Sequence, residues 1–414
     1  MQGDHVFSGG KMKYKENWEE TKKKFIDYWK HCNTGRPLMH VVARKPEIEH
    51  LAKKPHPEGN YHDQICQGLD YDVPDEYKWT DMTDKYQNPE KLVGRYRRFC
   101  ETHEFLGESF PNLNVDFGPG SLAAYLGSNV EFSEDNVWFE PCFKDEDMYW
   151  EDDIPKLQFD PENEWFKKHL AVVKGCKELA GDDFYIDIPD LMENIDVLAS
   201  LRDTSLLLMD LASEDEEMEE RVAQVTKAYY PAMQAMYDSC KDSDGASAYT
   251  VFQIWGPGKC IKLQCDAGAM ISPEMFRRFV LPSLKEQAEW GDQVLYHLDG
   301  PDNIRHLDAV LECDGISALQ WTSGDSGPDG TLPDWDKIYD KAVAKGLSLW
   351  IKVYSGETVD DWIKNVDRVV KKYGSSRTFF FFPEMSHDEA VKLLSYAEEN
   401  WSDVKGTHEK ELGL

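Results

Sequence analysis

The sequence predicts an α/β protein folded as a closed (β/α)₈ TIM barrel, and three observations lead to this prediction. Four strand–helix units follow one another without interruption from residue 293 onward. Further strand candidates near residues 38–43, 112–116, 184–188 and 249–266 bring the total to about eight. No glycine-rich dinucleotide fingerprint or P-loop follows any strand, which weakens the alternative of an open nucleotide-binding sheet. Successive βα units imply parallel strands with right-handed crossovers.

The C-terminal half alternates short apolar runs with amphipathic segments. Ser386 and Glu389 form a capping box at the start of one helix, and Ser272-Pro273 marks the start of another. The expected strands are 293–297, 315–320, 347–353 and 378–382, and the helices that follow them are 302–312, 334–345, 358–372 and 386–399.

The rest of the chain is expected to elaborate this barrel. Residues 1–35 are predicted as a helical extension, 36–400 as the barrel, 46–110 as a helical and aromatic insertion, and 401–414 as a tail. Helices are also expected at 162–180, 194–211 and 214–239. The acidic aromatic stretch 131–160 either lines a site or covers hydrophobic surface. The runs 249–255 and 260–266 form a hairpin, or a strand with a bulged neighbour.

Composition excludes several classes of function. The chain carries 78 acidic and 46 basic residues, a net charge of -32, so its surface repels nucleic acid and anionic membranes. No apolar run approaches the ~20 residues of a membrane-spanning helix. The polar N-terminus lacks the apolar core of a signal peptide, and the nine cysteines are scattered. A cytoplasmic protein is therefore expected.

The most informative stretch is 293–301, an apolar run that ends at Gly300-Pro301. His297 and Asp299 lie two residues apart near its end, so their side chains share one face of the strand. Burying an imidazole and a carboxylate together is costly. In parallel α/β proteins this end of the strands usually carries the chemistry. We interpret the pair as the centre of the site.

The expected strand ends deliver mostly carboxylates to one edge. Such a ring around a histidine is unstable unless a cation compensates its charge or several members stay protonated. The groups concerned are Asp116, Asp190, Asp266, His297, Asp299, Gln320, Trp321, Lys352, Tyr354 and Glu384. His297 and Asp299 suit Zn²⁺, with Glu384 as the first choice for a third ligand and Asp266 as the second.

Three alternatives stay open for these residues. The His–Asp pair could merely support the barrel mouth, or His297, Asp299 and Asp266 could perform metal-free acid–base catalysis. Asp266 could also be only a helix cap. Cys260 and Cys265 are either thiolate ligands or buried and inert, the usual state of scattered cysteines.

Residues expected to contact a small-molecule substrate surround this site. Gln320 would supply polar recognition beside an aromatic wall, although Trp321 could equally belong to the core. Lys352 would neutralise a substrate carboxylate or form a local salt bridge. The full predicted set is Asp116, Trp255, Tyr296, Gln320, Trp321, Lys352 and Tyr354.

From about residue 184 to 395 the chain resembles the uroporphyrinogen decarboxylase superfamily, which includes cobalamin-linked methyltransferases. The motifs that carry the resemblance are 195–198 with Arg202 and Asp210-Leu211, Asp266 with 271–276 and Leu281-Pro282, Tyr296-His297-Leu298-Asp299-Gly300, and 315–321. Residues 1–180 match only loosely. The superfamily fold is a (β/α)₈ barrel.

The resemblance is nearer to the methyltransferase branch, whose zinc site typically has His-x-Cys on this strand and a further Cys at the last strand. Asp299 stands in place of the first Cys, and Pro383-Glu384 lies near the other. An oxygen-rich site suits polarising an ether or alcohol oxygen more than activating a thiol. The implied reaction is O-demethylation of a small methoxylated or methylated substrate. A cobalamin on a separate corrinoid protein would receive the methyl group, because the chain has no DxHxxG motif.

The other branch implies a metal-free decarboxylase or lyase that acts on a small organic acid. That branch has an N-terminal arginine cluster, where this chain offers only Arg36, Arg44 and Lys45. A third possibility is a barrel that binds a ligand without turnover. A homodimer is left open.

Overall fold

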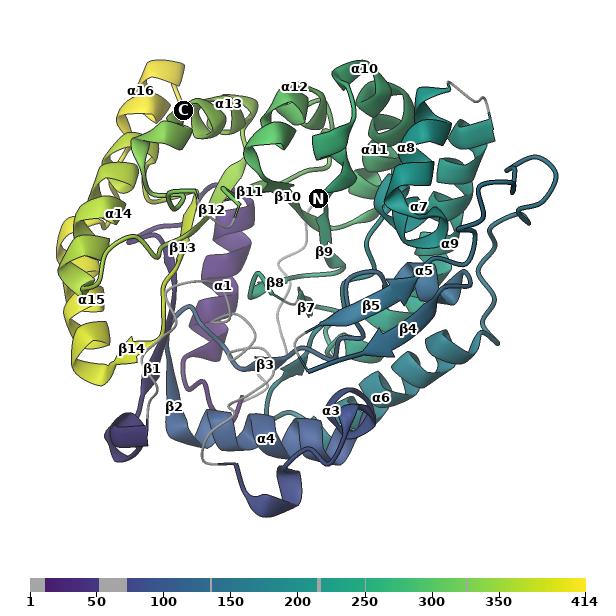
Figure 1. Cartoon of the computed structure of the whole chain (residues 1–414). Coiled ribbons are helices and arrows are strands. Elements are labelled where there is room, and N and C mark those ends of the chain that lie inside the picture. The colour runs from purple at the N-terminus through teal and green to yellow at the C-terminus, as the bar shows by residue number, and fades with distance from the viewer. Residues whose placement is uncertain (1–11, 52–72, 135, 214–216, 250, 325–326) are drawn as a thin grey trace.

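In the computed structural model, the residues described are 12–51, 73–134, 136–213, 217–249, 251–324 and 327–414. Their largest sheet has the order β14-β1-β13-β12-β11-β10-β9, with neighbours parallel and with β2 antiparallel to β1 (Figure 1). The strands are β1 (Leu38–Arg44), β2 (His103–Gly107), β9 (Cys260–Leu263), β10 (Gln293–Asp299), β11 (Ala318–Thr322), β12 (Ser348–Lys352), β13 (Thr378–Phe381) and β14 (Met385–Ser386). The predicted α/β class with a parallel sheet is confirmed.

The predicted closure into a barrel is not seen as a continuous ladder. β3 (Asn112–Leu113) pairs only with β6 (Tyr185–Ile186), and Ile188 forms an isolated parallel bridge with Tyr249. Within the described residues, no ladder joins β1 to β3 or β7 to β9. Hydroxyl groups span both gaps: Ser109 Oγ donates to Val41 O at 2.7 Å, and Ser247 Oγ accepts from Cys260 N at 3.0 Å. Strands of two or three residues are too short to sustain pairing on both edges.

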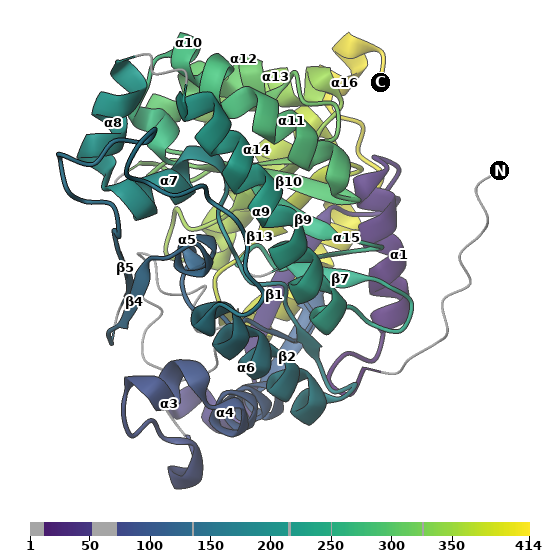
Figure 2. The ribbon, with the colours of Figure 1, turned by 90° about the vertical axis from the view of Figure 1, so that its right-hand side faces the viewer.

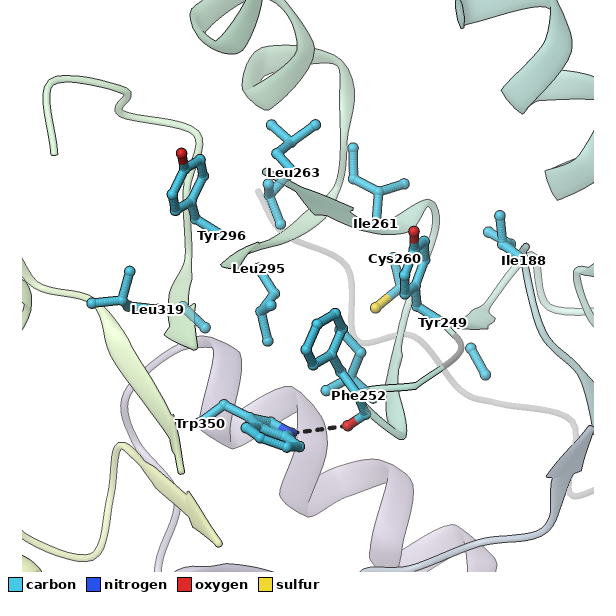
Figure 3. Close-up of a cluster of buried hydrophobic side chains, with 14 of the residues drawn as sticks. Ile188, Tyr249, Phe252, Cys260, Ile261, Leu263, Leu295, Tyr296, Leu319 and Trp350 are labelled. Carbon is cyan, nitrogen blue, oxygen red and sulfur yellow. Dashed lines mark hydrogen bonds between the residues drawn. The ribbon is translucent and has the colours of Figure 1, made fainter. Parts of the chain in front are cut away.

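The hairpin predicted between the runs 249–255 and 260–266 does not form among the described residues, because the second run becomes β9 and pairs parallel to β10. A different hairpin forms at the first run, as β7 (Ser247–Tyr249) antiparallel to β8 (Ile254–Gly256). Its tip points toward the inner face of the sheet, defined here as the face that carries Leu295 and Trp350. Figure 3 shows Phe252 beside these two side chains, with the Trp350 Nε1–H donating to Phe252 O at 2.8 Å. Val251 and Gln253 both have positive φ, at 44° and 50°. Such backbone persists only where surrounding contacts hold it.

Helices lie around the sheet, with α14 and α15 on one side and α6 and α9 on the other (Figure 1). The longer helices are α4 (Pro89–Thr102), α6 (Glu164–Ala180), α7 (Asn194–Arg202), α8 (Thr204–Ala212), α9 (Glu217–Cys240), α11 (Leu281–Trp290), α13 (Asp336–Lys345), α14 (Val359–Tyr373) and α15 (His387–Asn400). The shorter ones are α3 (Met82–Gln87), α5 (Ser121–Tyr125), α10 (Pro273–Met275), α12 (Leu307–Val310) and α16 (Thr407–Leu412), and β4 (Asn129–Phe132) pairs with β5 (Val137–Glu140). None of the helices in these ranges is long and apolar enough to cross a membrane.

Two expected helices differ from the prediction. The helix expected over 194–211 is broken at Asp203, whose φ is 85° and whose carboxylate caps α8 by accepting from Ser205 N at 2.8 Å. The segment expected to be helical over 302–312 begins as a 3₁₀ turn, Pro301–His306, before α12. The capping box at Ser386 and the cap at Ser272 are confirmed. Part of the predicted insertion, 52–72, lies outside the described residues.

Helix α1 (Trp18–Trp29) covers the N-terminal end of the strands (Figure 2). Its Tyr28 O accepts from the hydroxyl of Ser348, the first residue of β12, at 2.9 Å. Its Phe25 ring packs edge-on against Phe110 and Phe379, with ring centres 5.8 Å apart in both cases. This end of the sheet is therefore filled, which leaves the C-terminal strand ends for a site.

The acidic aromatic stretch covers hydrophobic surface, one of the two predicted roles. The Arg202 guanidinium donates to the backbone oxygens of Phe143 and Asp145 at 2.6 and 2.7 Å. Arg221 similarly donates to Pro155 O at 2.8 Å. Trp150 is buried between these anchors, and its indole N–H donates to Asp210 of α8 at 2.7 Å.

Candidate metal centre

Three side chains from neighbouring strand ends meet at the C-terminal edge of the sheet. β10 places His297 and Asp299 on its inner face, and Asp266 lies shortly after the adjacent strand β9, which ends at Leu263. One ligand atom from each residue lies within 4.8 Å of the others. Two carboxylates and one imidazole at this spacing could hold a single cation.

The orientation of His297 is set by the neighbouring strand. Gln320 of β11 is its register partner, and the Gln320 side-chain oxygen accepts from His297 Nδ1. The amide nitrogen of Gln320 donates to Thr322 Oγ1 at 2.8 Å. With its proton on Nδ1, the imidazole presents the lone pair of Nε2, which is the form in which histidine binds a metal. Phe252 packs beside the ring at 5.3 Å between ring centres.

Asp266 is held by its backbone and by one carboxylate oxygen. The Asp196 carboxylate accepts from the backbone N–H groups of Asp266 and Ala267, both at 2.8 Å. Burial, and then the nearby charge of Asp266, raises the pKa of Asp196 to about 7. The Asp266 side chain itself caps no backbone N–H of the following turn. Asp196 performs that capping, so the Asp266 carboxylate is available for another role.

Lys262 is a buried cation near Asp266 that the sequence-based prediction did not include. Lys262 is fully buried on the inner face of β9, and its ammonium lies 2.9 Å from Asp190 and 4.0 Å from Glu193. Burial alone would lower the pKa of Lys262, but the two carboxylates raise it above its usual value. Burial raises the pKa of Glu193 well above its ordinary range. The signal was present as alternating polar residues, Lys262, Gln264 and Asp266, within an apolar strand.

Glu384, the first choice for the third ligand, lies in a different cluster. Its carboxylate is 2.9 Å from Arg44 Nε and 3.5 Å from His103 Nε2. The reason is the parallel pairing of β14 with the end of β1, which brings Arg44 beside it. Across the described ranges, the group able to hold a metal consists of Asp266, His297 and Asp299. The structure therefore favours the second choice, Asp266.

Several predicted substrate contacts are packed elsewhere. Trp255 belongs to the cluster under α1, with its indole N–H donating to the Tyr185 hydroxyl at 3.0 Å. Tyr296 lies on the face of β10 opposite His297 and is buried. Trp321 is also buried and packs on Trp335 at 4.9 Å. For Tyr296 and Trp321, strand alternation turns the ring to the face opposite His297 and Gln320.

The other predicted contacts stay near the strand ends. Asp116 follows β3, accepts from Gly118 N at 2.8 Å and lines a small pocket with Trp79, Tyr86 and Asn114. The Lys352 ammonium lies 5.8 Å from the centre of the Tyr354 ring. The Tyr354 hydroxyl contacts Ser323 Oγ at 3.2 Å.

The cysteines near the site are not placed as thiolate ligands. Cys260 and Cys265 are both buried, and burial raises the pKa of each thiol well above its usual value. A protonated thiol is a poor metal ligand. The donor set is thus one nitrogen and two carboxylates, which fits zinc or a harder divalent ion.

Comparisons with known proteins bear on the fold. No protein-family model matches the chain, and no curated protein matches it, so the resemblance to the uroporphyrinogen decarboxylase superfamily stays a prediction. A solved structure described as a methyltransferase from Methanosarcina mazei is similar over 92% of this chain and 98% of that one. The TM-score is 0.51 and the sequence identity is 15%. At this identity the likeness shows a shared fold.

Proposed function

We propose that the chain is a methyltransferase that holds a divalent cation, zinc in the first instance, on Asp266, His297 and Asp299. It would remove a methyl group from the oxygen of a small substrate and pass it to cobalamin on a separate corrinoid protein. The observation that carries the proposal is the convergence of the three ligand atoms within 4.8 Å at the open end of the strands. The likeness to a structure described as a methyltransferase supports it.

The cation would polarise the substrate oxygen and so stabilise the leaving alkoxide or phenolate. The chain's own residues would do the rest. Gln320 keeps the proton of His297 on Nδ1, and Phe252 fills the space beside the imidazole. Lys352, Tyr354 and Asp116 are proposed to orient the substrate from the surrounding strand ends, whereas the buried Gln320 amide is engaged by His297 and Thr322.

The metal-free decarboxylase alternative has less support. Its substrate would need basic side chains free to bind carboxylates. Arg36 is already paired with Glu108 at 2.6 Å and with Glu398 at 2.8 Å. Arg44 is paired with Glu384 at 2.9 Å.

The first test is metal content. Wild-type protein that is dialysed against metal-free buffer and then supplied with one equivalent of Zn²⁺ should retain the ion. The Zn²⁺ affinity of His297→Ala should be lower by about 10–100-fold or more, because a ligand is removed. His387→Ala, at a side chain that is 41% exposed, is the control. Transfer of methyl groups from methoxylated compounds to reduced cobalamin should require the ion. A folded wild-type protein that binds no divalent metal would overturn the proposal.

A further inference from the structure

Two glutamines flank the candidate ligands, Gln320 on β11 and Gln264 just after the end of β9. Gln320 contacts His297, and Gln264 contacts Asp266, to which its side-chain N–H donates at 2.8 Å. We propose that Gln264 and the buried Lys262 act together as positioning residues that select the Asp266 oxygen presented to the cation. The proposal rests on the metal centre proposed above.

The chemistry of the ammonium sets the direction of this chain of hydrogen bonds. An ammonium group donates and cannot accept, so the Gln264 atom that faces Lys262 must be the carbonyl oxygen Oε1. The other end of the amide is then the nitrogen, which donates to Asp266 Oδ2. Because Oδ2 is engaged in this way, Oδ1 is the oxygen left to face the cation.

Lys262 and Gln264 are themselves held firmly. The ammonium is buried against Asp190 at 2.9 Å, a pairing that a buried charge requires. The backbone N–H of Gln264 donates to Glu193 at 3.3 Å, and its backbone oxygen accepts from the Asn194 side chain at 2.8 Å. The backbone of Gln264 is therefore fixed, and its side-chain amide is held at one end by Lys262 and at the other by Asp266.

A purely structural role for Lys262 makes a different prediction. If Lys262 only neutralised Asp190 and Glu193, its removal would lower stability without a specific effect on the metal ligands. If it holds the Gln264 amide in place, its removal leaves the amide oxygen without a donor and lets the side chain move away from Asp266. Asp266 Oδ2 would then lose its hydrogen bond, and the carboxylate could turn.

The test is a double-mutant cycle read by metal binding. Zn²⁺ affinity is measured by calorimetry, and ligand geometry by the visible spectrum of the Co²⁺-loaded protein, for the wild type, Lys262→Met, Gln264→Met and the double variant. Each single variant should lose about 10–100-fold in affinity and show an altered Co²⁺ spectrum. The double variant should lose no more than Gln264→Met alone, because both changes interrupt one interaction.

Lys15→Met is the matched control, because Lys15 is also a buried lysine but donates to the backbone oxygens of Phe105 and Gly107 at 3.0 and 2.7 Å. It should lose stability and keep wild-type metal affinity. If Lys262→Met does not fold, Gln264→Leu decides together with Gln264→Met. Both variants remove the N–H that donates to Asp266 without adding a charge beside the cation, so both should bind Zn²⁺ more weakly than the wild type.

The outcomes separate this inference from the proposed function. A wild type that binds no metal defeats the proposed function and this inference with it. A wild type that binds, with Gln264 variants within about threefold of it and an unchanged Co²⁺ spectrum, overturns the positioning role alone. Losses that multiply in the double variant also overturn it, because the two residues would then act independently.

Discussion

At the scale of single residues, two histidines on the inner face of the sheet show how surroundings decide a role. His297 is partly exposed at a strand end and has a hydrogen-bond acceptor on Nδ1. His40 is fully buried on β1 and stacks on Phe381 with ring centres 4.4 Å apart. Burial lowers the pKa of His40 to about 3. His40 is therefore neutral at physiological pH and belongs to the packing of the fold.

His40 should make the protein sensitive to acid. As pH falls below 6.5, the unfolded state takes up a proton on this imidazole, but the folded state does not do so until about pH 3. The contribution of neutral His40 to the free energy of unfolding is therefore complete above pH 6.5, and it is lost as the pH falls from 6.5 to about 3. His40→Phe should reduce the slope of unfolding free energy against pH by about 1.4 kcal/mol per pH unit between about pH 6 and 4.

Urea titrations at several pH values measure this slope. Val391→Ala is the control, because that exposed side chain carries no titratable group and its removal should leave the slope unchanged. Equal slopes for His40→Phe and the wild type would contradict the account of His40. His169 is also buried, and burial lowers its pKa to about 4, so part of the acid sensitivity should persist in the variant.

At the scale of elements, α1 and the β7–β8 hairpin determine where a site can form. α1 covers one end of the strands, and the hairpin places Phe252 between that end and the candidate ligands. Both elements are rich in aromatic residues, and aromatic rings dominate core energetics because of their area. The C-terminal ends of the strands are left to polar side chains.

Phe25→Ala tests the contribution of α1. The variant removes a fully buried ring from contacts with Phe110, Trp255 and Phe379. It should lower the free energy of unfolding by about 3–5 kcal/mol. Lys23→Ala, at an exposed position of the same helix, should change it by less than about 0.5 kcal/mol. Urea unfolding gives both values, and a folded Phe25→Ala protein with reduced Zn²⁺ affinity would show that α1 also shapes the metal centre.

At the scale of the whole molecule, the pairing of β14 with β1 decides which acid joins the histidine. Asp266→Asn should therefore reduce Zn²⁺ affinity by about 10–100-fold. Glu384→Gln should leave that affinity unchanged, and it should lower stability because it breaks a buried contact with Arg44. Metal analysis and thermal unfolding of the two variants provide the comparison. A loss of zinc in Glu384→Gln with retention in Asp266→Asn would reverse the assignment.

Much of the fold could be predicted because its signals are local. The βα units after residue 293 and the caps at Ser272 and Ser386 are confirmed. The shared face of His297 and Asp299 also follows from strand alternation alone. The breaks at Asp203 and in the segment 301–310 were not predicted, because helical periodicity continues through both.

The amino-acid sequence by itself determined the α/β class, the parallel strands and the face that His297 and Asp299 share, since each depends on residues close together in the chain. Only the tertiary structure decided that Asp266 joins them, that Glu384 pairs with Arg44, and that Lys262 is buried beside the site. It also decided that Trp255, Tyr296 and Trp321 face the core. These outcomes depend on which strand ends become neighbours and on where a buried charge finds its partner, and both are set by packing between distant segments.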